Sequence, residues 1–196
     1  MKALSILFTF LLAVPSWAAV TKHVVEYTSK DGAKLEGVAF YDDLKSASLP
    51  AVIIVHDRMG PSEFTESKAK ELANLGYVTF AADIYGKGVR PKDGKEAGEL
   101  AGKYKNDRGL LRSRIQAAYD QVKNMAFVKS VNSPAKIDKE IVVMGYCFGG
   151  TTALELARSG AQLVGVATFH GGLSTPTPAD AKNIKAPVLV MHGADD

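Results

Sequence analysis

The stretch Ile141–Gly150 reads IVVMGYCFGG, and a helix-forming segment from Thr151 to Arg158 follows it. An apolar, β-branched run therefore breaks at a cysteine flanked by glycines, which allow the backbone to bend sharply between a strand and a helix. The pattern Gly-x-Cys-x-Gly is that of a nucleophile elbow in which sulfur replaces the serine oxygen. The sequence therefore predicts that Cys147 is lifted above the carboxyl edge of a parallel sheet.

Cys147 is the only cysteine of the chain. The N-terminus of a helix favours the thiolate, which is the attacking form of the group. The next amide, that of Phe148, is expected to point at the carbonyl oxygen of a substrate. The alternative is a buried cysteine that serves as a small hydrophobe, but the turn residues around it favour the nucleophile. Redox chemistry is disfavoured because no second cysteine is present to resolve a disulfide.

The composition indicates one globular domain. The 196 residues are 46% hydrophobic and 23% charged, which suits a sizeable core. The net charge of +3 is too small to indicate nucleic-acid binding, and no block of like charges occurs. The histidines are not spaced as pairs of metal ligands, and the elbow glycines lack the Lys-Ser/Thr pair of a phosphate-binding loop. We therefore expect neither a metal nor a cofactor.

The first 18 residues predict export. Lys2 precedes an apolar run from Leu4 to Val14, which is too short to anchor the chain across a bilayer, and Ser16-Trp17-Ala18 supplies the small residues that a signal peptidase needs. We expect a Sec-type signal peptide over residues 1–18, cleavage after Ala18, and a bacterial periplasmic or secreted domain over residues 19–196 with no stable membrane insertion. The alternative is an N-terminal membrane anchor. An oxidising compartment penalises idle thiols, which favours a functional Cys147.

Alternating and continuous apolar runs predict an α/β architecture. Alternation over residues 22–28 and 34–41, separated by a turn signal, predicts an antiparallel hairpin. Continuous apolar runs predict strands buried on both faces of a parallel sheet, and these fall at residues 49–56, 77–83, 163–169 and 186–192. Apolar spacing predicts helices over residues 63–75 and 110–127, with a short helix at 96–104 inside the polar excursion 89–107.

With these elements in view, the sequence resembles the dienelactone hydrolase family of α/β-hydrolases from about Leu49 to Asp196. The resemblance implies a mostly parallel sheet with helices on both faces. Four motifs carry it together, namely VHDRMG at 55–60, ADIYG at 82–86, GYCFGG at 145–150 and HGADD at 192–196.

The family resemblance implies a Cys-Asp-His triad that hydrolyses carboxylic esters or lactones. Cys147 matches the nucleophile, and Asp196 matches the acid, with Asp195 as the alternative. The amides of Phe148 and Arg58 match the oxyanion hole. Asp57 stands where family members can place a glutamate that contacts the resting thiol.

The base is the main departure from the family pattern. His56, His170 and His192 end predicted strands and precede the acid in the chain, and we interpret His170 and His192 as structural strand-end residues. We expect the catalytic histidine, the last strand and the closing helix to be missing from a C-terminally incomplete domain. Lys87 and Arg90 are candidates for attracting a substrate carboxylate. The alternative function is a non-catalytic periplasmic binding or scaffold protein that retains the hydrolase fold.

Overall fold

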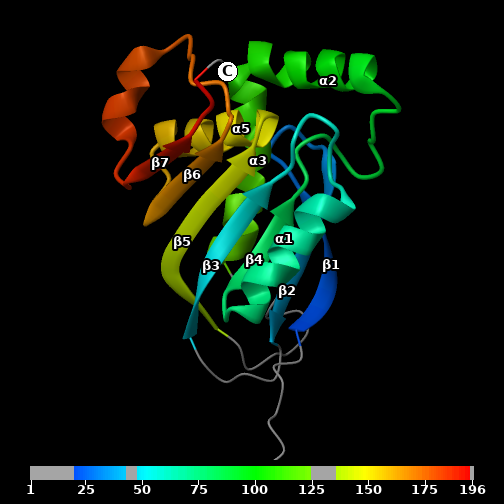
Figure 1. The fold of residues 1–196 in the computed structure, drawn as a ribbon, viewed down its shortest axis with the longest axis vertical. Coiled ribbons are helices and arrows are strands. Elements are labelled where there is room, and N and C mark those ends of the chain that lie inside the picture. The colour runs from blue at the N-terminus through cyan, green and yellow to red at the C-terminus, as the bar shows by residue number, and fades with distance from the viewer. Residues whose placement is uncertain (1–19, 43–47, 125–135, 195–196) are drawn as a thin grey trace, which may run out of the picture.

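The computed structural model describes residues 20–42, 48–124 and 136–194. These residues form a seven-stranded, mostly parallel sheet with helices on both faces (Figure 1), which confirms the α/β-hydrolase architecture. The predicted signal peptide, residues 1–18, and the candidate acids Asp195 and Asp196 lie outside the described residues, so these predictions stay predictions.

The strand order in the sheet is β1-β2-β4-β3-β5-β6-β7. Strands β4, β3, β5, β6 and β7 run parallel, while β1 pairs with β2 and β2 pairs with β4 in the antiparallel sense. The strands are β1 Val20–Thr28, β2 Lys34–Asp42, β3 Ser48–Val55, β4 Val78–Ala82, β5 Lys136–Tyr146, β6 Gly165–Phe169 and β7 Val188–Met191. The predicted hairpin is therefore confirmed, and the parallel strands bring their carboxyl ends to one edge.

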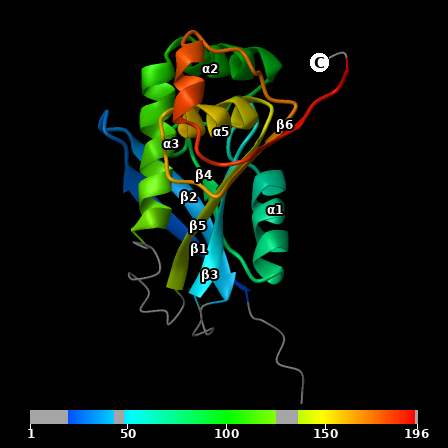
Figure 2. The ribbon, with the colours of Figure 1, turned by 90° about the vertical axis from the view of Figure 1, so that its left-hand side faces the viewer.

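Helix α1, Glu63–Asn74, covers one face of the sheet, and helices α3, Arg108–Lys123, and α5, Phe148–Arg158, cover the other (Figure 2). Each face has its own apolar core. The smaller core lies under α1 and includes Ile54 and Ala69, whereas the larger core lies under α3 and α5 and includes Ile53, Ile115 and Leu156. Neighbouring strand residues thus point into different cores, which is why the central strands are apolar throughout.

Three elements differ from the sequence prediction. Helix α2 spans Gly94–Asn106, longer than the predicted 96–104, because Asp93 caps it by accepting hydrogen bonds from the amides of Lys95 and Glu96. Helix α3 spans Arg108–Lys123, two residues earlier than predicted, since Asp107 accepts from the Leu110 amide. A 3₁₀ helix, η1 Pro178–Asn183, was not predicted.

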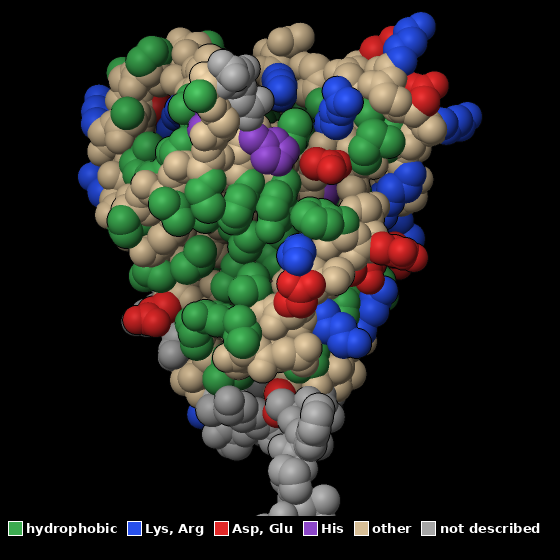
Figure 3. Space-filling model, in the orientation of Figure 1, with side chains coloured by type: hydrophobic (Ala, Val, Ile, Leu, Met, Phe, Trp, Pro, Cys, Tyr) green, Lys and Arg blue, Asp and Glu red, His purple; other side chains and the backbone are tan. Residues whose placement is uncertain are grey.

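One part of the sheet is left uncovered by the described helices. Strand β7 is an edge strand, and its apolar side chains Val188, Leu189 and Val190 are exposed. Figure 3 shows hydrophobic side chains gathered on this view of the molecule, in the region that α1 leaves open. Within the described part of the chain, no helix combines the length and the apolar character needed to cross a bilayer.

Candidate active site

Cys147 lies at the turn between β5 and α5, Phe148–Arg158, as the elbow pattern predicts. Its backbone has φ 53° and ψ −114°, a conformation that L-residues rarely adopt. The turn is held by hydrogen bonds from the Cys147 amide to the Phe169 carbonyl (2.9 Å) and from the Gly150 amide to the Cys147 carbonyl (3.0 Å). Strain of this kind persists only where the surrounding structure fixes it, and it clusters at functional sites.

The glycines around Cys147 are required by close backbone contacts. A Cβ on Gly145 would lie 2.2 Å from the carbonyl carbon of Gly149. A Cβ on Gly149 would lie 2.3 Å from the Val55 carbonyl oxygen and 2.5 Å from that of His56. Residues 145 and 149 must therefore lack side chains, and the start of α5 packs directly on the end of β3.

Phe148 supplies the first amide of α5, where a helical N–H has no partner one turn earlier. Its side chain is fully buried, and its ring packs against those of His56 (5.8 Å between centroids) and Tyr85 (5.2 Å). The amide is consequently fixed beside the partly exposed thiol of Cys147. The role of this amide as an oxyanion donor stays a prediction.

The loop after β3 carries the second predicted amide, that of Arg58. Asp57 folds this loop, because its Oδ1 accepts a hydrogen bond from the Met59 amide (2.7 Å) and its carbonyl accepts one from the Gly60 amide (3.2 Å). The hydroxyl of Tyr85 donates to the Arg58 carbonyl (3.0 Å). The loop is therefore tied to the aromatic cluster that also packs on Phe148.

Tyr85 belongs to the ADIYG motif at 82–86, and the motif alone indicates no role for it. Burial, followed by the nearby Asp57, Tyr104 and Cys147, raises the pKa of Tyr85 above its ordinary value. The hydroxyl thus stays protonated and remains a donor. The sequence signal available was the position of Tyr85 just after β4, at the carboxyl edge of the sheet.

His56 has a structural role in the folded protein. It is fully buried, its Nδ1 donates to the Asp57 carbonyl (2.6 Å), and its Nε2 accepts from the Ile84 amide (3.3 Å). Burial lowers the pKa of His56 to about 4. Because both ring nitrogens are occupied, this histidine has no nitrogen with which to accept a proton from the thiol.

His170 and His192 are exposed and follow the carboxyl ends of β6 and β7. His170 has a positive φ of 41°, and its amide donates to the Met191 carbonyl (2.7 Å). Both histidines therefore lie at the edge of the sheet that carries the elbow. Among the described residues, no group of three or more His, Cys, Asp and Glu side chains is arranged to hold a metal ion.

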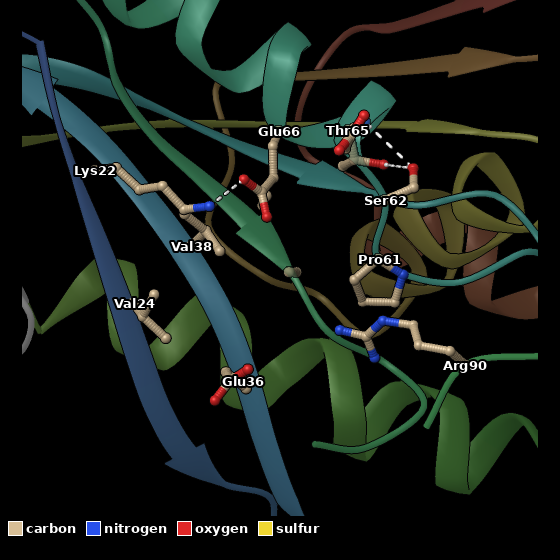
Figure 4. Close-up of a pocket in the computed structure, with 12 residues that line it drawn as sticks. Lys22, Val24, Glu36, Val38, Pro61, Ser62, Thr65, Glu66 and Arg90 are labelled. Carbon is tan, nitrogen blue, oxygen red and sulfur yellow. Dashed lines mark hydrogen bonds and ion pairs between the residues drawn. The ribbon is translucent and has the colours of Figure 1, made fainter. Parts of the chain in front are cut away.

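Lys87 and Arg90 follow Tyr85 in the chain and lie near the β1–β2 hairpin. The Lys87 ammonium forms ion pairs with Glu26 on β1 and with Glu36 on β2, the latter at 3.3 Å. Arg90 lines a cavity of about 440 Å³ between the hairpin and the start of α1, together with Pro61 and Ser62 (Figure 4). Lys87 is thus paired with two glutamates of the hairpin. Its contact with a substrate carboxylate stays a prediction.

Comparison with known proteins identifies the family of the chain. The model of the dienelactone hydrolase family matches residues 36–196. The chain belongs to the dienelactone hydrolase family. The match extends the resemblance found in the sequence to β2, because residues 36–48 are included as well.

Relatives in this family cover most of the chain. A protein of Aquifex aeolicus (strain VF5) named "Putative carboxymethylenebutenolidase" is 29% identical over 177 residues, which are 88% of this chain and 71% of that protein. A dienelactone hydrolase-like promiscuous phosphotriesterase from metagenomic libraries is 35% identical, with a TM-score of 0.78 over 91% of this chain and 70% of that one. The structure named m3DLH is also 35% identical, with a TM-score of 0.79 over the same shares. The chain is thus a hydrolase of the family that acts on lactones and esters.

Proposed function

We propose that this enzyme hydrolyses a carboxylic ester or lactone through a covalent thioester on Cys147. The observation that carries the proposal is the strained backbone of Cys147, held at the sharp turn between β5 and α5 beside the Phe148 amide. A positive φ at a non-glycine residue is maintained here by glycines that admit no side chain. A structural cysteine needs no such conformation.

The first half of the reaction forms the thioester. The Cys147 thiolate attacks the carbonyl carbon, and the amides of Phe148 and Arg58 hold the oxygen that becomes negative, with each good donor contributing about 3 to 4 kcal/mol by analogy with other acyl-transfer sites. The tetrahedral intermediate then collapses, so that the C–O bond to the leaving alcohol breaks and the alcohol oxygen takes a proton. In a lactone this alcohol stays attached to the acyl group.

The second half consumes water. A base removes a proton from water, the hydroxide attacks the thioester carbonyl, and the C–S bond breaks to release the carboxylic acid and restore the thiolate. We infer that a histidine performs both proton transfers and that Asp196, or Asp195, orients it. The candidates for this base are a histidine that follows Asp196 in a longer gene product and, within the described residues, His170 and His192.

The proposed substrate is defined by the bond that is cleaved, the C–O bond of a carboxylic ester or lactone. Asp57 is one methylene shorter than the glutamate that family members can place in this loop. We propose that Asp57 holds the shape of the loop by accepting a hydrogen bond from the Met59 amide, and that it also contacts the resting thiol. Lys87 remains a proposed contact for a substrate carboxylate, in competition with Glu26 and Glu36.

The second candidate function is a periplasmic binding or scaffold protein that keeps the hydrolase fold. The observation that favours it concerns His56, whose ring packs on that of Phe148. Both ring nitrogens of His56 are occupied by hydrogen bonds, so this histidine is not free to act as the base. In either case we propose that the chain is exported by its first 18 residues.

A kinetic experiment separates the two candidates. The complete gene product and its Cys147→Ala variant are assayed with p-nitrophenyl acetate and with a simple lactone. We expect the variant to lose at least about a thousandfold in kcat, because the nucleophile is removed while binding is kept. Equal hydrolysis by the two proteins would show that Cys147 is not the nucleophile. Binding of small esters without turnover by the parent would favour the binding protein.

A further inference from the structure

The turn of the β1–β2 hairpin is joined to the interior by a buried arginine. Arg114 of α3 is nearly buried, and its Nη2 lies 2.9 Å from Oδ2 of Asp31, while its Nε lies 3.1 Å and 3.2 Å from the two carboxylate oxygens. Ser29 donates a further hydrogen bond to Asp31 Oδ1 (2.5 Å). A planar guanidinium bound by both carboxylate oxygens has a fixed orientation.

The other side of the same guanidinium holds the segment that follows β4. Its Nη1 donates to the carbonyls of Ile84 (3.3 Å) and Tyr85 (3.2 Å). The Tyr104 hydroxyl also donates to the Tyr85 carbonyl (3.0 Å), and the Tyr104 ring lies 5.7 Å from the Arg114 guanidinium carbon. The backbone of Tyr85 is consequently fixed from the α2 and α3 side.

Tyr85 connects this fixed segment to the loop after β3 that carries the Arg58 amide, called the oxyanion loop below. Its amide donates to Asp83 Oδ1 (3.0 Å), and its hydroxyl donates to the Arg58 carbonyl (3.0 Å). Its ring lies 4.7 Å from that of His56 and 5.2 Å from that of Phe148. A continuous series of polar contacts therefore runs from Asp31 through Arg114 and Tyr85 to the peptide that follows the Arg58 amide.

We propose that Asp31 and Arg114 are positioning residues for the oxyanion hole, acting through Tyr85 on the loop that carries Arg58. This inference rests on the proposed hydrolase function, because Asp31 and Arg114 would act on the loop that holds the oxyanion and not on the substrate itself. A buried guanidinium without its carboxylate turns toward water or other acceptors. The carbonyls of Ile84 and Tyr85 then lose a charged donor, and the oxyanion loop loses its alignment, for which misplacement by about 1 Å costs up to about a hundredfold in rate.

The test compares two ion pairs on the same helix in the complete gene product. Asp31→Asn removes the carboxylate charge from Arg114. Asp180→Asn is the matched control, because Asp180 is similarly exposed (26% against 32%) and pairs with Arg112, two residues earlier on α3. The contacts of Arg112 run to Glu155 and Asp180 instead of to the Tyr85 segment. Asp31→Glu, which restores a carboxylate, is the conservative variant.

We expect Asp31→Asn to lower kcat for p-nitrophenyl acetate about tenfold with KM changed less than twofold, because an oxyanion donor acts mainly in the transition state. Asp180→Asn should change kcat less than twofold at a similar loss of stability, and Asp31→Glu should recover most of the lost rate. The rate of Cys147 alkylation by iodoacetamide should stay the same in all variants, since that reaction forms no oxyanion.

Amide hydrogen exchange provides a readout that does not depend on activity. Exchange over residues 56–61 and 84–88 should be faster in Asp31→Asn than in the parent and unchanged in Asp180→Asn. Unchanged exchange in Asp31→Asn, or an equal loss of kcat in the two asparagine variants, would overturn the positioning role. A parent protein without esterase activity that still shows the predicted exchange difference would overturn the proposed function and leave the mechanical coupling established.

Discussion

At the scale of single residues, His56 combines complete burial with two backbone hydrogen bonds. Its Nδ1–H donates to Asp57 and its Nε2 accepts from Ile84, so the neutral ring joins the oxyanion loop to the segment after β4. Protonation would replace the acceptor at Nε2 with a second donor facing an N–H group. The neutral form is therefore part of the folded structure.

This residue predicts a loss of stability in mild acid. The pKa of His56 is lowered to about 4 in the folded protein, whereas an unfolded histidine titrates near 6.5, so the unfolded chain takes up a proton first as the pH falls. The stability is fully present above pH 6.5 and declines toward pH 4. Between pH 7 and pH 5 we expect the free energy of unfolding attributable to His56 to fall by about 2 kcal/mol.

Urea unfolding of the parent and of His56→Asn at both pH values measures this effect. The asparagine retains a side-chain donor for the Asp57 carbonyl and does not titrate. We expect it to be less stable than the parent at pH 7 and to lose less stability on going to pH 5. Equal losses in the two proteins would show that His56 does not account for the acid sensitivity.

At the scale of secondary-structure elements, the junction of β5 and α5 depends on glycine. A Cβ at position 149 would lie 2.3 Å from the Val55 carbonyl oxygen, and backbone atoms cannot move away cheaply. We expect Gly149→Ala to lower the free energy of unfolding by at least about 3 kcal/mol, at the upper end of the usual cost of overpacking. Thermal or urea unfolding measures the change.

Gly98 in α2 provides the matched control. A Cβ there would have no neighbouring atom within 4 Å, and the residue is helical. Gly98→Ala should therefore stabilise the protein by about 0.5 to 1 kcal/mol, since alanine favours the helix and restricts the unfolded chain. Equal destabilisation by both alanines would contradict the assignment of close packing to the elbow.

The elements were more predictable from the sequence than their contacts. The elbow, the hairpin and the central strands follow from turn residues and apolar runs, which are local signals. The role of Tyr85 depends on its contacts with Arg58 and Arg114, which are distant in sequence. Its motif therefore indicated that Tyr85 lies at the carboxyl edge of the sheet, but not which residues it contacts. Helix η1 was missed because its sequence, PADAKN, is too short to show a helical period.

The candidate site was predictable to the same extent. The sharp turn at Cys147 was expected from the glycines around it, and the structure has this turn, with a positive φ at Cys147. The complete burial of His56 was not expected, because the sequence showed only its place at the end of a strand. The ion pairs of Lys87 with Glu26 and Glu36 were not expected, because they join a loop to two strands of the hairpin. Charge alone does not tell which partner a lysine meets.

At the scale of the whole molecule, the first 18 residues predict export and processing. The complete gene, expressed in a bacterium, should yield a periplasmic protein that begins at Ala19, because Ser16-Trp17-Ala18 fits the cleavage preference of signal peptidase. N-terminal sequencing of the periplasmic and cytoplasmic fractions measures this directly. A membrane-bound protein that retains Met1 would contradict cleavage and favour the anchor.

The central claim is that Cys147 carries the acyl group during turnover. The most direct measurement is the mass of the complete protein, quenched in acid within milliseconds of mixing with p-nitrophenyl acetate, followed by peptide mapping. We predict an added acetyl group on the peptide that contains Cys147, and none in Cys147→Ala. Turnover of the ester with no acyl group on Cys147, or with the acyl group on another residue, would contradict the account.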